Sequence, residues 1–157
     1  MRDQRLTAAS AAYIVYTAVM LILERRMRAT GGPGIIPFEL AGSEARAEDI
    51  MAKWGSAGLR AARLSMWLDF GYMATYGTLM ALLVDRARRR RGHPAALLAM
   101  VIGAVAGDAA EGVALLKVLN RERVAAHARR AQIAALIKFA LLGGALTYVI
   151  FGARARR

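Results

Sequence analysis

The chain has 157 residues, of which 57% are hydrophobic, and it carries a formal net charge of +12. It contains no cysteine, which excludes disulfides, thiolate chemistry and zinc–sulfur sites. The length suits one domain over residues 1–157. The charged residues are clustered between long apolar stretches, as they are in membrane proteins.

Four apolar stretches are long enough to cross a membrane as helices. They cover residues 6–23, 64–84, 95–119 and 131–151. A helix rises about 1.5 Å per residue, so about 20 residues cross a hydrocarbon layer about 30 Å thick. These stretches are apolar on all sides, whereas the helices of a soluble bundle have a polar face. The sequence therefore predicts an all-α bundle of four transmembrane helices.

The connection between the first two spans, residues 24–63, is the longest in the chain. Ser43 is a suitable N-cap, and apolar residues recur at helical spacing after it. We expect an amphipathic interfacial helix over about residues 44–58, which bends at Gly55 or Gly58 into the second span.

The densest basic cluster of the chain, Arg86 with Arg88–Arg91, lies between the second and third spans. Because it holds no aromatic residue that could stack on bases, we interpret it as a membrane flank and expect no nucleic-acid partner. Its density predicts that this loop and both termini lie in the cytoplasm. The Ala- and Arg-rich composition favours a bacterial inner membrane.

Four ionisable side chains lie inside the predicted spans: Asp69, Asp108, Glu111 and Lys138. A charge at the bilayer centre costs about 2.5–3.5 kcal/mol on insertion scales, so such residues usually face the bundle and have a role. Residue counts place all four in one slab, near the end of the bundle beneath the long first loop. We expect Lys138 to pair with Glu111 or Asp108, and Asp69 to bond a tyrosine hydroxyl or an arginine.

Aromatic residues share the depth and faces of these charges. Tyr72 and Tyr76 follow Asp69 at helical spacing, and Tyr16 lies at a similar depth on the first span. We predict a polar intramembrane cavity covered by the amphipathic helix. The predicted site comprises the acid–base residues Asp69, Asp108 and Glu111 and the ligand contacts Tyr16, Trp54, Tyr72, Tyr76 and Lys138.

Three carboxyl groups in this slab surround one lysine, so at least one of them must be protonated or paired with an arginine. A neutral carboxylic acid in an apolar pocket can donate a proton to a ligand. Lys138 would compete with a metal ion for the same carboxylates, so we predict no metal and no other cofactor. A purely structural role, in which Lys138 sets the helix register, stays open.

Several short strings resemble a family of small, uncharacterised bacterial four-span membrane proteins. They are FELAGSEARA at residues 38–47, Trp54-Gly55, SMWLDF at 65–70, GDAAE at 107–111 and IKFA at 137–140. The resemblance covers most of the chain and implies the four-span fold, but no activity. A weaker similarity of layout to the sterol-isomerase and sigma-2-receptor group implies that such a bundle can hold a lipid-like ligand.

Three classes of function fit these features. The first is an integral membrane protein that binds, or acts by acid–base chemistry on, a lipid- or isoprenoid-like molecule. The second is a small proton-coupled transporter, and the third is a structural or assembly subunit without catalysis. The expected partners are membrane lipids and a hydrophobic small molecule, and association into a homo-oligomer stays open.

Overall fold

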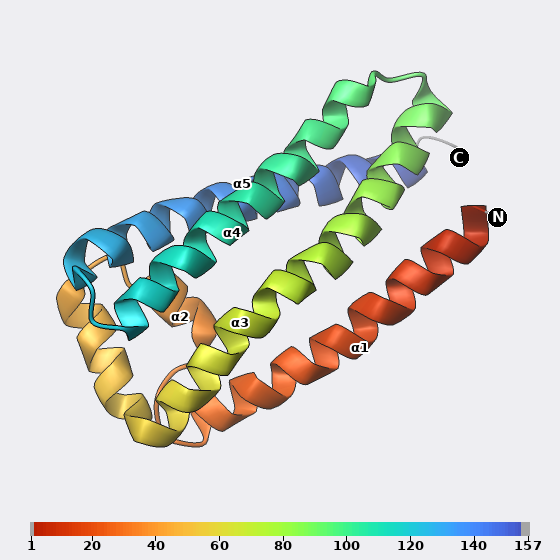
Figure 1. Cartoon of the computed structure of the whole chain (residues 1–157). Coiled ribbons are helices and arrows are strands. Elements are labelled where there is room, and N and C mark those ends of the chain that lie inside the picture. Colours follow the sequence, from red (N-terminus) through yellow and green to blue (C-terminus); the bar gives the residue numbers. More distant parts are fainter. Residues whose placement is uncertain (1, 155–157) are drawn as a thin grey trace.

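The computed structural model describes the backbone of residues 2–154 and the side chains of residues 4–151; this part of the chain is helical and has no strand. The helices are α1 (Arg2–Arg28), α2 (Ile35–Glu39), α3 (Glu44–Arg91), the 3-10 helix η1 (Ala95–Leu98), α4 (Ala99–Leu119) and α5 (Val124–Arg154). The N-terminus, the α3–α4 turn and the end of α5 lie at one end of the molecule, and the α4–α5 turn lies at the other (Figure 1).

Three helices in the described chain are long and apolar enough to cross a membrane: Gln4–Arg28, Ala95–Leu119 and Val124–Phe151. They contain three of the four predicted spans. The remaining stretch, residues 64–84, is the second part of α3 and does not belong to this set. It is less apolar because it includes an aspartate, two tyrosines and two threonines.

The three apolar helices are poorly covered by the rest of the protein. Within the most apolar stretch of 18 residues in each helix, only 6% to 28% of the residues are buried inside the protein. Large hydrophobic side chains such as Ile14, Ile102 and Ile137 are at least half exposed. A bilayer provides the apolar surroundings that this surface requires, so the helices are compatible with a membrane protein.

The predicted amphipathic helix is the first part of α3. It begins after Ser43, whose side chain accepts a hydrogen bond from the Arg46 backbone N–H at 3.4 Å. It ends at Gly55, where φ of +54° and ψ of −164° break the helix. The structure therefore confirms the N-cap and selects Gly55 from the two glycines at which a bend was predicted.

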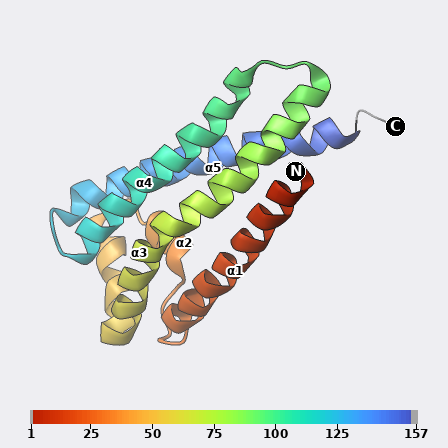
Figure 2. The ribbon, with the colours of Figure 1, turned by 45° about the vertical axis from the view of Figure 1, so that its right-hand side comes forward.

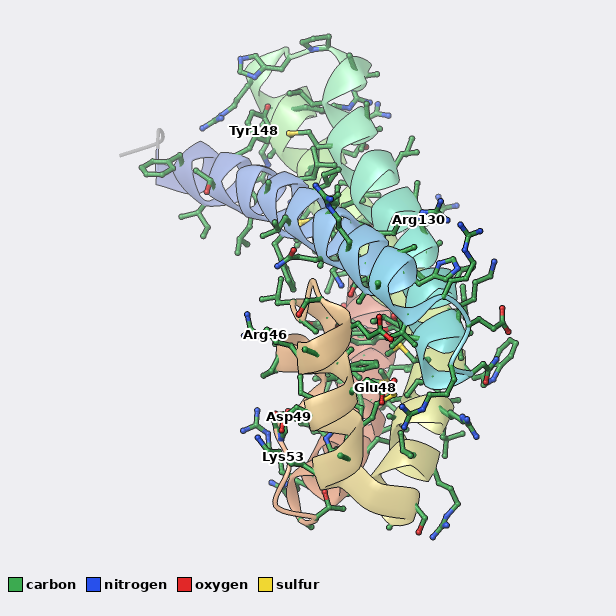
Figure 3. The ribbon with its side chains drawn as sticks, turned by 90° about the vertical axis from the view of Figure 1, so that its left-hand side faces the viewer. Arg46, Glu48, Asp49, Lys53, Arg130 and Tyr148 are labelled. Carbon is green, nitrogen blue, oxygen red and sulfur yellow. The ribbon has the colours of Figure 1, made fainter. Side chains whose placement is uncertain are left out.

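The two faces of this segment differ as an amphipathic helix requires. Arg46, Asp49 and Lys53 are exposed and project away from the molecule (Figure 3). On the opposite face, Ile50 and Trp54 are buried in an apolar cluster. The segment thus closes one end of the bundle.

Two apolar clusters stabilise the described part of the bundle, one near each end. The larger cluster joins the first part of α3 to the end of α4 and the start of α5, with Trp54 and Leu119 as members. The smaller one is built on Val84, Val101 and Ala145. Along α3, α4 and α5, the residues between the two clusters include the buried charged side chains.

The long helices pack in two pairs. α1 packs along α3, and α4 packs along α5, while α3 also contacts α4 and α5 (Figure 1, Figure 2). The short α2 contacts α3 and α5. This arrangement brings a residue of the first loop beside the charges of α4 and α5.

Candidate functional site

Lys138 on α5 is the centre of a buried charge cluster. Its Nζ lies 2.9 Å from Asp108 Oδ1 and 2.7 Å from Glu111 Oε2, both on α4. The i, i+3 spacing of the two acids puts them on one face of α4, toward α5. Lys138 is 6% exposed and Glu111 1%. The predicted pairing of Lys138 is therefore confirmed, and it involves both acids.

A third carboxylate reaches Lys138 from the first loop. Glu39, the last residue of α2, is 8% exposed, and its Oε2 lies 3.6 Å from Lys138 Nζ. Sequence reasoning missed this residue because it lies outside every predicted span. The available signal was its place in a largely apolar segment, since Phe38 beside it is also buried.

Burial raises the pKa of the Glu39 carboxyl above its ordinary value of 4.5, and Lys138 opposes this shift. The Oε2 atom of Glu39 is buried and forms no hydrogen bond with any described residue. A buried acceptor without a donor is costly, and protonation of the carboxyl replaces an acceptor by a donor. Glu39 is therefore suited to hold a proton.

Tyr76 extends the cluster from α4 to α3. Its hydroxyl donates a hydrogen bond of 2.6 Å to Asp108 Oδ2, while the other oxygen of Asp108 accepts from Lys138. Asp108 thus connects α3, α4 and α5 at one level. The sequence placed Tyr76 at the depth of these charges but predicted a tyrosine bond to Asp69, not to Asp108.

Asp69 does not take the partner that was predicted for it. It is half-buried, and it forms no hydrogen bond or ion pair with a tyrosine or an arginine in the described part of the chain. The hydroxyl of Tyr76 bonds Asp108 on α4 instead. Arg63, an arginine of the first loop, donates to the Leu119 carbonyl oxygen at 2.8 Å.

The tyrosines of α1 and α3 pack against one another. The rings of Tyr13 and Tyr16 stack on Tyr72, with centroids 5.6 Å and 6.1 Å apart. The hydroxyls of Tyr72 and Thr17 are 3.1 Å apart. Tyr16 covers Gly71, where a Cβ would collide with its hydroxyl. Tyr16 and Tyr72 therefore form the α1–α3 interface, and Tyr76 contacts the charge cluster.

Trp54 is packed as a core residue. It is 1% exposed, its Nε1 donates to the Pro33 carbonyl oxygen at 2.6 Å, and its ring centroid is 4.9 Å from that of Phe38. The close approach requires small neighbours, because a Cβ at Gly32 or Gly58 would meet the indole. Trp54 therefore fills the interior at the α4–α5 end of the bundle.

An apolar groove of about 570 Å³ runs between α3 and α4. Its walls come from α3 between Met73 and Ala81 and from η1 and α4 between Leu98 and Ala109, and Thr78 is polar. A second, charged hollow lies between the start of α1 and the end of α3. No residue of the predicted site lines either the groove or this hollow. The predicted ligand contacts remain predictions.

Comparisons of the chain with protein-family models, with curated proteins and with solved structures find no match. The chemical character of the site therefore comes from its geometry. Three carboxylates share one lysine between two apolar clusters, and a tyrosine hydroxyl completes the hydrogen bonding of Asp108.

Proposed function

We propose that this protein is a four-span membrane protein that binds a lipid- or isoprenoid-like molecule and uses its carboxylate–lysine cluster as a proton donor and acceptor. The observation that carries the proposal is the contact of Lys138 with Glu39, Asp108 and Glu111. An apolar groove lies beside the Tyr76 end of this cluster.

The packing of α3 supports its second part, residues 64–84, as the fourth span. This segment lies between α1 on one side and α4 and α5 on the other (Figure 2). A helix that packs alongside three spans passes through the same layer of the membrane. Its polar residues are tolerated because several of them face neighbouring helices: Tyr72 contacts Thr17, and Tyr76 contacts Asp108.

With four spans, both termini and the loop at residues 92–94 lie on the same side of the membrane. The arginines that precede this loop support the cytoplasm as that side. The resemblance to small bacterial four-span proteins supports the inner membrane of a bacterium as the location.

Charge balance supports a proton in the cluster. If Glu39, Asp108 and Glu111 were all ionised, a single ammonium group would face three buried negative charges. Such an excess of charge is strongly disfavoured in a low-dielectric interior. One bound proton reduces this excess but leaves two carboxylates beside one ammonium group, and a ligand with a basic or unsaturated group would accept such a proton.

The groove supports a hydrophobic ligand. It is almost entirely apolar and lies on the outer surface of α3 and α4, where lipid has access. Its wall residues Gly77 and Ala109 directly follow Tyr76 and Asp108 in the chain. The hydrogen bond between Tyr76 and Asp108 therefore joins the two helices at the level of the groove.

The groove is tested by filling it. Ala106 is an exposed wall residue, and Ala110 is an exposed residue of α4 outside the wall. Ala106→Trp should remove lipid-like molecules that co-purify with the protein and are measured by mass spectrometry, whereas Ala110→Trp should retain them. Equal retention by both variants would reject the groove as the ligand site.

The chemistry is tested by Asp108→Asn and Glu111→Gln, which keep size but remove ionisation. With the fold intact, both variants should retain the co-purified ligand and lose its turnover in lipid extracts. The control is Asp49→Asn, at an exposed acid paired with Lys53. Unchanged turnover in both variants would leave the cluster a structural role. If the wild-type protein held no lipid but carried a proton flux in vesicles, and both variants lost that flux, the result would favour a proton-coupled transporter.

A further inference from the structure

A charged hollow of about 610 Å³ is lined by residues from the start of α1 and the end of α3. These two helix ends lie at the end of the molecule opposite the α4–α5 turn (Figure 1). Four arginines line it: Arg5 from α1, and Arg86, Arg89 and Arg90 from α3. The volume is in the range of small-molecule sites, about 300–1,000 Å³, and exceeds what one ion fills.

The lining of the hollow is strongly basic. Asp85 is the one acid among the described lining residues, and it is already bound by Arg89 at 2.7 Å and by Arg88 at 2.5 Å. These contacts keep Asp85 ionised, since the hydrogen bond from Arg89 lowers its pKa below the ordinary value. Arg5 and Arg90 form no ion pair with a described residue, so their guanidinium groups are available to an anion.

The hollow also has a direction. Leu6 and Leu82 line it on the side toward the bundle: Leu6 is one residue inward from Arg5, and Leu82 is about one to two helical turns inward from the arginines of α3. Apolar surface therefore lies toward the membrane interior, and the guanidinium groups lie toward the cytoplasmic face of the proposed orientation. A phospholipid at the bilayer surface has the same order of apolar and anionic parts.

We propose that this hollow binds the phosphate group of an anionic ligand, with guanidinium groups from both α1 and α3. Guanidinium groups match phosphate oxygens in geometry and charge, and basic pockets at the cytoplasmic ends of spans are typical sites for anionic lipid headgroups. The phosphate belongs to a phospholipid headgroup or to a soluble phosphate. The site lies far from Lys138 along the helices and does not depend on the acid–base proposal.

The test uses the full chain in an uncharged detergent and titration calorimetry. The probes are dihexanoyl phosphatidylglycerol, dihexanoyl phosphatidylcholine and inorganic phosphate. Arg5→Gln with Arg90→Gln removes one guanidinium from each wall. The control, Arg129→Gln with Arg130→Gln, removes the same charge from two exposed positions on α5.

Wild-type protein should bind phosphatidylglycerol more tightly than phosphatidylcholine. The Arg5/Arg90 variant should bind it at least about tenfold more weakly, because charge-assisted hydrogen bonds are lost, and the control should change little. Competition by inorganic phosphate would assign the site to soluble phosphates, and its absence would assign it to lipid headgroups. Equal wild-type affinity for the two lipids, or an equal loss in the control, would overturn the proposal.

Discussion

Lys138 is the side chain on which the buried charge of this bundle depends. It is the one cation in contact with Glu39, Asp108 and Glu111 among the described residues. Lys138→Met would leave three buried carboxyl groups without a counter-charge. We expect a loss of about 3–5 kcal/mol in the free energy of unfolding, measured by denaturant titration in detergent.

The control for this change is Lys53→Met, because Lys53 forms an exposed ion pair with Asp49 at 2.7 Å. Exposed pairs contribute about 0–1 kcal/mol, so this variant should be nearly as stable as wild type. Adding Glu111→Gln to Lys138→Met should recover part of the loss, because it removes one uncompensated acid. Equal stabilities of the two lysine variants would show that the cluster holds no essential charge pairing.

Glu39 makes stability depend on pH in a defined direction. Burial raises the pKa of its carboxyl in the folded state, while Lys138, Asp108 and Glu111 face it from α4 and α5. The folded protein therefore holds this proton more tightly than the unfolded chain does. Its contribution to stability is present below the unfolded pKa, near 4.5, and is lost as the pH rises through the folded pKa.

We expect Glu39→Gln to reduce the decline in the free energy of unfolding that accompanies rising pH in wild-type protein. Unfolding measured in detergent at a series of pH values checks this. Glu122→Gln, at an exposed acid of the α4–α5 turn, should keep the wild-type slope. If Glu39→Gln also kept that slope, the Glu39 carboxyl would not hold the additional proton.

At the level of elements, Gly55 allows the first part of α3 to fold across the end of the bundle. Its φ of +54° with ψ of −164° is a conformation essentially confined to glycine. A Cβ at this position would meet no other atom within 4 Å, so the cost of a substitution is conformational. Gly55→Ala should lower the free energy of unfolding by about 1–3 kcal/mol.

Gly143 is a matched control for Gly55. A Cβ there also meets nothing within 4 Å, but Gly143 lies inside α5 and does not have a positive φ. Gly143→Ala should be neutral or stabilise by up to about 1 kcal/mol, because alanine favours a helix. Denaturation of both variants in detergent tests the pair, and equal effects would mean that the bend does not require glycine.

For the whole molecule, the number of spans determines which loops share a side of the membrane. The chain has no cysteine, so single cysteines can be labelled without background. Gln4, Ala45, Ala95 and Ala125 are exposed; Ala95 is the first residue of the third proposed span, and the other three lie before or between the proposed spans. With four spans, cysteines at 4 and 95 should react from the cytoplasmic side, and those at 45 and 125 from the other.

Labelling of intact and permeabilised cells with an impermeant maleimide measures this pattern. If α3 did not cross the membrane, the cysteine at 95 would react from the same side as that at 45. A reversed pattern with the same alternation would keep the four spans and reverse the orientation. These results are independent of any ligand.

Local patterns in the sequence determined the helical class, the apolar helices and the ends of the amphipathic segment. Ser43 could be identified as the N-cap, and the bend could be limited to Gly55 or Gly58, because capping and helix breaking depend on a few neighbouring residues. The pairing of Lys138 with Glu111 or Asp108 could also be predicted, because depth in a helix follows from counting residues, and the structure shows that Lys138 contacts both. A regular rise of the chain turns sequence position into spatial position.

Only the tertiary structure decided where the irregular first loop lies and which gaps are filled. Glu39 reaches Lys138 because α2 folds between α3 and α5, and no periodicity in residues 29–43 predicts that path. Trp54 fills the end of the bundle, and Tyr72 stacks on α1, so faces predicted to border an open cavity are in contact. Periodicity shows which face of a helix points inward, but the distance between facing helices depends on how their side chains pack together.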